Sequence, residues 1–174
     1  MDKKSLMNDL KQIVLKEVPN AVKKVKLDKG DKICYISLIG TDYEPVLGLI
    51  QFGIESYRNE IIKSVGIDDK WSIWNTGEMP VEYQTVIDGD NFAEKQEQLV
   101  KDFGDDWENL WDECQRLRFE VAQQLNSYNW SEILTITEDF VVFSDWESID
   151  VANGDLESSI PKEKLEIIKA KNLI

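Results

Sequence analysis

The chain has 174 residues, 34 of them acidic and 20 basic, so its formal net charge is −14. A negative field of this size repels nucleic acid and anionic membranes, and we expect neither as a partner. Histidine is absent, which removes the commonest general base, the usual partner of a nucleophile and the commonest metal ligand. We therefore expect a protein without histidine chemistry, cofactor or metal.

The charge is unevenly distributed along the chain. The first 32 residues hold nine lysines and five acids, a net charge of +4. The remaining residues hold 11 basic and 29 acidic side chains, a net charge of −18. This acidic body would attract basic partners, although many acidic domains carry such charge for solubility alone.

The first predicted element is a basic helix. Apolar residues recur at helical spacing from Leu6 to Val18, and Pro19 is expected to end or bend the helix. We expect this helix, within residues 1–27, to pack on a single domain that spans 1–174.

A hairpin and a second helix are predicted next. Two short apolar runs, Ile33–Ile39 and 46–52, are separated by turn residues at 40–45, a pattern typical of two paired strands with a longer loop. Ser56 is placed to cap the following helix, and Gly66 is placed to stop it.

The middle of the chain predicts two weak strands and two helices. Segments 71–74 and 81–86 read as short strands. Helices are predicted over 90–103 and 106–125, with Gly104 at the break between them.

The last part of the chain predicts a second hairpin and a last helix. The runs 133–137 and 140–144 would pair and turn at 138–139. An acidic, irregular stretch over 145–157 follows, and Pro161 suits the first turn of a helix. Because hairpins imply antiparallel pairing, the expected fold is α+β, a mostly antiparallel sheet built from hairpins and flanked by about four to five helices.

Familiar catalytic and metal-binding motifs are missing from the sequence. It contains no phosphate-binding glycine loop and no GxSxG. Residues 88–91 start like a calcium loop, but Phe92 and Ala93 stand where an oxygen ligand and a glycine are needed. Cys34 and Cys114 lack zinc-site spacing and sit in apolar patterns, so we expect buried thiols. With no signal-peptide-like start and no long apolar run, these thiols predict a cytoplasmic protein.

Carboxylates gather in two segments that are candidates for binding a partner. The candidate residues are Asp105, Asp106, Glu108, Asp112, Glu113, Asp145, Trp146 and Glu147. In a helix, Asp105, Glu108 and Asp112 would share one face. Three interpretations stay open: a solvated face, a binding face for a basic partner, and a catalytic or metal-binding cluster.

The same predicted helix has an apolar stripe. Its members are Trp107, Leu110, Trp111, Cys114, Leu117, Val121 and Leu125. This periodicity predicts core packing, because a platform that stacks bases or sugars would need exposed rings. We assign most of the tryptophans near loops to the core as well.

Four short motifs carry a resemblance to a known family. They are the strand Ile33-Cys34-Tyr35-Ile36-Ser37-Leu38, the segment Trp71-Ser72-Ile73-Trp74, the strand that ends in Ser144-Asp145, and Glu157-Ser158-Ser159-Ile160-Pro161. From about residue 30 onward the chain resembles the bacterial family called domain of unknown function 4303. The resemblance marks Trp71, Trp74, Asp145 and Ser158.

The chain also departs from that family's pattern. Ile160-Pro161 stands in place of an Asn-Pro pair, and 53–56 in place of a more polar turn. The resemblance implies a small cytosolic bacterial protein without an assigned activity. Some family members resemble the immunity proteins of toxin systems.

Three functions are compatible with this sequence. We favour a non-enzymatic protein-binding module with no catalytic residues, such as an immunity protein that occludes a basic toxin or another basic partner. The alternatives are a carboxylate-dependent hydrolase and a small self-associating regulatory domain.

Overall fold

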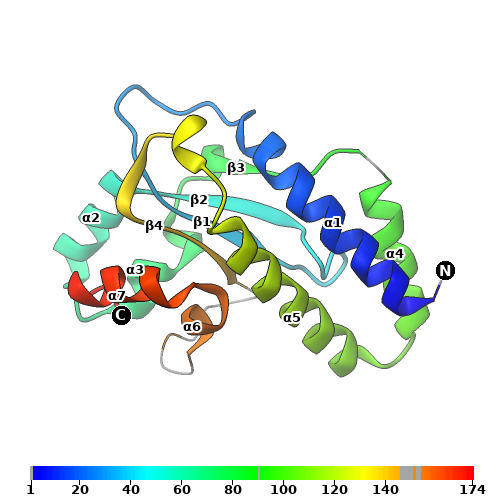
Figure 1. Ribbon diagram of the computed structural model, residues 1–174. Helices are drawn as coiled ribbons and strands as arrows, with labels where there is room; N and C mark the ends of the chain where they lie inside the picture. Colours follow the sequence, from blue (N-terminus) through cyan, green and yellow to red (C-terminus); the bar gives the residue numbers. More distant parts are fainter. Residues whose placement is uncertain (1, 90, 146–150, 152–153) are drawn as a thin grey trace.

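A four-stranded sheet with helices on both faces forms the fold (Figure 1). The computed structural model describes residues 2–89, 91–145, 151 and 154–174. The sheet order is β3-β2-β1-β4. The strands are β1 (Ile33–Ile39), β2 (Leu49–Ile54), β3 (Gln84–Thr85) and β4 (Ile136–Asp145). The predicted α+β class is confirmed.

The sheet is mixed, so the prediction of a mostly antiparallel sheet is wrong in part. The first predicted hairpin is present, with β1 antiparallel to β2, and β3 adds to β2 in the same sense. β4, in contrast, runs parallel to β1. The second predicted hairpin is therefore one long strand that returns to the sheet after the helices.

A bulge explains why β4 looks like a hairpin in the sequence. Ile33 pairs with Ile136 but Tyr35 pairs with Val141, so two steps along β1 match five along β4. The charged pair at 138–139 lies in this irregular stretch. These residues widen the strand locally and do not reverse it.

Seven α-helices form within the described residues, more than predicted. They are α1 (Lys3–Val22), α2 (Glu55–Val65), α3 (Lys70–Trp74), α4 (Phe92–Phe103), α5 (Trp107–Leu125), α6 (Asp155–Ser159) and α7 (Lys162–Ala170). Short 3-10 turns η1 (Thr76–Glu78), η2 (Val81–Tyr83) and η3 (Trp130–Glu132) connect them. The predicted strand at 71–74 is thus a helical turn, and of the predicted strand at 81–86 only Gln84–Thr85 forms a strand, directly after η2. Ser56 lies inside the first turn of α2 and does not cap it.

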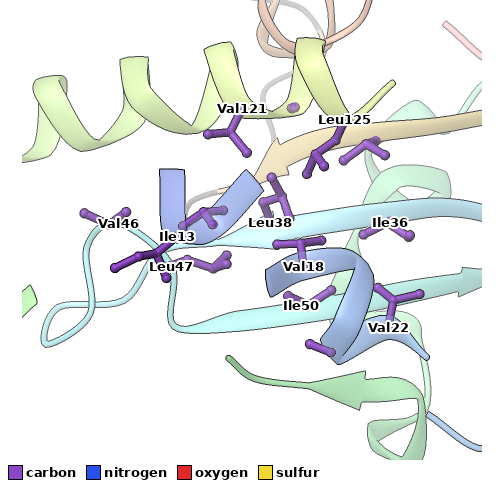
Figure 2. Close-up of a cluster of buried hydrophobic side chains, with 14 of the residues drawn as sticks. Ile13, Val18, Val22, Ile36, Leu38, Val46, Leu47, Ile50, Val121 and Leu125 are labelled. Carbon is purple, nitrogen blue, oxygen red and sulfur yellow. The ribbon is translucent and has the colours of Figure 1, made fainter. Parts of the chain in front are cut away.

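The larger core lies between the sheet and three helices, α1, α4 and α5. Figure 2 shows Ile13, Val18 and Val22 of α1 among strand residues such as Leu38 and Ile50. A second core on the other sheet face joins α3, α6 and α7 around the rings of Tyr35, Trp74 and Phe143. The helices therefore form two apolar layers, one on each face of the sheet.

Helix α1 continues through Pro19, contrary to the prediction that it ends or bends there. Proline removes one intrahelical hydrogen bond, at a cost of roughly 3 kcal/mol. Val18 and Val22 on either side are fully buried, and each such side chain contributes roughly 1.5–3 kcal/mol. Burial of this last turn thus offsets the proline.

The outer edge of β4 is closed by side chains. Val142 donates its N–H to Asn126 Oδ1 at 2.9 Å, and Asn126 Nδ2 donates to the Val142 carbonyl at 2.7 Å. Ser144 donates its N–H to Ser159 Oγ at 3.1 Å, and Lys164 Nζ donates to the Phe140 carbonyl at 2.9 Å. Side chains after α5, in α6 and in α7 replace a neighbouring strand.

We predict that Asn126→Ala destabilises the fold by about 3 kcal/mol, because it leaves the N–H and carbonyl of Val142 buried without partners. Urea denaturation would measure the loss. Gln124→Ala, an exposed change on the same helix, is the control, and we expect it to cost about 0.5 kcal/mol or less. Equal effects of the two substitutions would contradict the proposed role of Asn126.

Candidate functional site

The five predicted carboxylates at the start of α5 divide into two groups. Asp105, Glu108 and Asp112 are exposed and pair with no lysine or arginine in the described part of the chain. Asp106 and Glu113 point toward α1, where they line a hollow of about 360 Å³ together with Lys3 and Lys4. The three residues of the first group line none of the hollows beside α1 and are called here the acid face.

Asp145 does not belong to that surface, which corrects the sequence prediction. Its side chain is 3% exposed, and Oδ2 accepts a hydrogen bond from Thr76 Oγ1 at 2.9 Å. Because side chains alternate along β4, Asp145 shares a sheet face with Phe143 and points inward. Trp146 and Glu147 lie outside the described residues.

The residues marked by the family resemblance differ in their surroundings. Trp74 is fully buried and donates Nε1–H to the Leu173 carbonyl at 2.8 Å. Trp71 is 53% exposed on α3. Ser158 is exposed, and its carbonyl accepts a hydrogen bond from Gln123. With Asp145 buried as well, two of the four residues are inside the protein and two outside.

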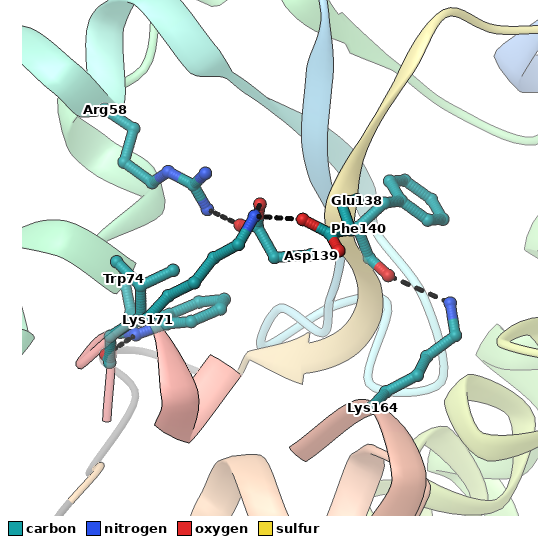
Figure 3. Close-up of polar contacts among 8 residues, drawn as sticks. Arg58, Trp74, Glu138, Asp139, Phe140, Lys164 and Lys171 are labelled. Carbon is teal, nitrogen blue, oxygen red and sulfur yellow. Dashed lines mark hydrogen bonds and ion pairs between the residues drawn. The ribbon is translucent and has the colours of Figure 1, made fainter. Parts of the chain in front are cut away.

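A buried charged cluster lies where α2 and the end of α7 meet β4. Arg58 Nη1 lies 2.6 Å from Asp139 Oδ2, and both side chains are almost fully buried. Lys171 Nζ lies 2.8 Å from Asp139 Oδ1 and 3.3 Å from Glu138 (Figure 3). The cluster fastens α2 and the end of α7 to the β4 bulge.

The electrostatics of this cluster favour the ionised form of Asp139. Burial alone would raise the pKa of Asp139, but hydrogen bonds and charge from Arg58 and Lys171 outweigh it and hold the pKa below its usual value. The pKa of Lys171 is raised, first by its hydrogen bond to Asp139. An ionised, enclosed carboxylate of this kind offers a substrate no access, so the cluster acts as a structural fastener. Within the described residues, no group of three acids or cysteines is placed to hold a metal ion.

An open groove on the surface is the stronger candidate. Its volume is about 710 Å³. Its lining comes from the β1–β2 loop, α4 and α5: Asp42, Tyr43, Glu97, Val100, Trp107 and Trp111. We call it the aromatic groove. Glu108 and Asp112 each follow a lining tryptophan on α5, so they lie about 100° further around the helix than the groove wall.

Exposed rings in this groove correct the predicted apolar stripe. Leu110, Cys114 and the later members of the stripe are buried as predicted, but Trp107 is 44% exposed. Trp111, one helical turn later, is only half-buried. The stripe is continuous in sequence. The first turns of α5, however, lie beside α4 and the β1–β2 loop, whereas its later turns pack against the sheet. The rings therefore form the wall of a groove.

The loop that carries Asp42 and Tyr43 is held in place by a buried amide. Gln96 of α4 is fully buried, and its Oε1 accepts the N–H groups of Val46 and Leu47, each at 3.0 Å. Its Nε2 donates to the Leu47 carbonyl at 3.1 Å. Because α4 also forms part of the groove, one side chain fixes two walls relative to each other.

Two further contacts restrict this loop. Arg118 of α5 donates to the Pro45 carbonyl and to Ser144 Oγ, which joins the loop to β4. A Cβ at Gly48 would lie 2.7 Å from Thr41 Cγ2, so the loop closes tightly on itself. The groove is thus preformed and loses little conformational freedom when a ligand binds.

The two carboxylates of the groove differ in their partners. Glu97 pairs with Lys101 at 2.7 Å, and this hydrogen bond lowers the pKa of Glu97. Asp42 is exposed and has no ion-pair partner among the described residues. Electron-rich ring faces beside an unpaired carboxylate are chemically suited to a cation.

Sequence reasoning missed Asp42, Tyr43 and Glu97. The turn residues at 40–45 predict a loop, and an aromatic residue such as Tyr43 within a turn-forming segment is expected to be exposed. Nothing local in the sequence indicates that this loop lies against α4 and α5, because Gln96 makes that contact across about fifty residues.

Comparisons with protein-family models, curated proteins and solved structures found no match. The resemblance described above therefore stays a prediction. No helix in the described residues is long and apolar enough to cross a membrane.

We predict that Asp139→Asn destabilises the fold by about 3 kcal/mol at pH 7, because Arg58 loses its buried counter-charge. The folded-state pKa of Asp139 is lowered, so its stabilisation is present above the unfolded value of about 4 and is lost as the pH falls through the folded value. The difference in the free energy of unfolding between wild type and variant should therefore decrease at acidic pH. Urea denaturation at pH 7 and below pH 4 tests this. Asp68→Asn, an exposed aspartate outside the cluster, is the control. A penalty for Asp139→Asn that does not change with pH would refute the assignment.

We also predict that Gln96→Leu releases the groove loop. The N–H groups of Val46 and Leu47 lose their acceptor, so their hydrogen exchange should accelerate, with a stability loss of about 2 kcal/mol. NMR-detected exchange would report both residues separately. Gln98→Leu, two positions away and exposed, should leave their exchange rates unchanged.

Proposed function

We propose that this protein is a non-enzymatic binding module for a basic protein partner, which it engages through the acid face and the aromatic groove. The observation that carries the proposal is the position of Trp107. It is an exposed ring on a preformed groove that also holds the unpaired carboxylate of Asp42. Exposed tryptophan at the centre of a surface is typical of a binding anchor.

The charge pattern supports a partner of positive sign. The net charge of −18 after residue 32 would steer a basic protein toward this body. Lys11 of α1 pairs with Glu120, and no lysine of α1 pairs with the acid face among the described residues. Unpaired carboxylates on the same helix as an aromatic anchor combine long-range attraction with a point of attachment.

Occlusion is the mechanism that this surface suits. A partner that binds across α5 and the β1–β2 loop would have its basic patch covered. An immunity protein that blocks a basic toxin is one form of this proposal, and the family resemblance described above favours that form.

We predict that neutralising the acid face weakens binding to a basic partner about tenfold. The variant combines Asp105→Asn, Glu108→Gln and Asp112→Asn, and each exposed charge contributes a few tenths of a kcal/mol or more. Calorimetry at low and physiological salt, against panels of purified basic and acidic proteins, measures the effect.

A control variant removes the same charge elsewhere on the surface. Glu60→Gln, Glu132→Gln and Glu163→Gln are exposed positions on other elements. If some basic protein binds, and the control weakens it as much as the acid-face variant does, only net charge matters and the proposed site is wrong. If no basic protein binds in a salt-dependent way, the proposed function is wrong.

A further inference from the structure

We infer that the aromatic groove receives one arginine side chain of the partner, and that Lys101 acts as an internal competitor for this cation. The inference rests on the proposed function and specifies the ligand of its anchor point. It follows from three features of the groove: its rings, its unpaired carboxylate and its one internal ion pair.

A cation is the occupant favoured by the exposed rings. Tyr43 is 87% exposed and Trp107 44% exposed, from two different elements that line one hollow. The face of an aromatic ring is electron-rich and attracts a positive group. Asp42, next to Tyr43 in the chain, supplies a full negative charge without an ion-pair partner among the described residues.

Arginine suits this groove better than lysine does. The guanidinium group is planar, so it stacks on a ring while its edge donates two hydrogen bonds to one carboxylate. An ammonium group is more strongly hydrated and loses more solvation in a half-open groove. Val100 lines the same hollow and offers an apolar contact for the arginine stem.

Lys101 already holds the second carboxylate of the groove. Its Nζ lies 2.7 Å from Glu97 Oε1, one helical turn apart on α4. Both side chains are well exposed, so the pair is weak and an incoming cation can replace it. Removing the lysine charge therefore leaves Glu97 available and takes away a repulsion. Binding of a cation should then become tighter.

The experiment uses small probes, so that no partner has to be known. N-acetyl-arginine amide, N-acetyl-lysine amide and the neutral isostere N-acetyl-citrulline amide are titrated into the full chain. NMR follows the indole N–H signals, which separate Trp107 from the other tryptophans. Trp111, which lines the same groove, is the reporter for the variants that lack Trp107. We expect the arginine probe to bind in the millimolar range, several-fold tighter than the lysine probe, with no saturable binding of citrulline.

Matched substitutions locate the site. Asp42→Asn and Trp107→Leu should each weaken binding of the arginine probe about threefold or more. Trp107→Phe keeps an aromatic ring and should retain most of the affinity for this probe. Lys101→Met should tighten binding about twofold. The controls are Asp68→Asn and Trp71→Leu, an exposed carboxylate and an exposed tryptophan elsewhere, which should change nothing.

Several results would overturn the inference. They are equal binding of citrulline, preference for lysine, a neutral disaccharide binding in place of the cation, or no gain from Lys101→Met. The same measurements distinguish failure of the arginine site from failure of the proposed protein-binding function. Basic proteins that respond to the acid-face variant but ignore Asp42→Asn and Trp107→Leu would refute only the arginine site. Probe binding without any basic-protein binding would refute only the protein-binding function.

Discussion

β4 is an edge strand that is almost entirely buried, and the rest of the fold depends on how its free backbone groups are satisfied. A buried N–H or carbonyl without a partner costs free energy comparable to a lost hydrogen bond. Asn126, Ser159 and Lys164 meet this demand from three separate segments of the chain. The arrangement closes the edge against another strand and fixes where α5, α6 and α7 can lie.

The groove follows from that constraint. Asn126 anchors the C-terminal end of α5 beside β4, so the nineteen-residue helix carries its N-terminal turns out toward α4 and the β1–β2 loop (Figure 1). Arg118, midway along α5, joins the loop to Ser144 of β4. The hydrogen bonds that satisfy the sheet edge thus also position the walls of the candidate site.

Sequence reasoning succeeded where the signal was local. The periodicity of α4 and α5 and the turn residues before β2 set those elements to within a few residues. It failed where a distant partner decides the outcome. The sequence around Asp139 predicts a turn, but Asp139 is buried in an ion pair with Arg58. The apolar periodicity predicts that Trp107 is buried, but its ring is exposed. Glu108 and Asp112 lie one turn apart on α5, as their spacing predicts, but Asp105 precedes the helix and does not share its face by helical spacing. The groove formed with α4 and the β1–β2 loop was not predictable from spacing.

The basic helix α1 forms ion pairs with both helices that pack beside it. Lys11 pairs with Glu120 of α5, and Asp9 of α1 pairs with Lys95 of α4. These exposed pairs add little stability individually, but they balance part of the charge where α1 meets α4 and α5. Asp42, Glu108 and Asp112, in contrast, pair with no cation in the described part of the chain. A surface made for solubility alone has no need of an exposed indole in the same groove as Asp42, and this combination is the basis of the proposed recognition of a cation.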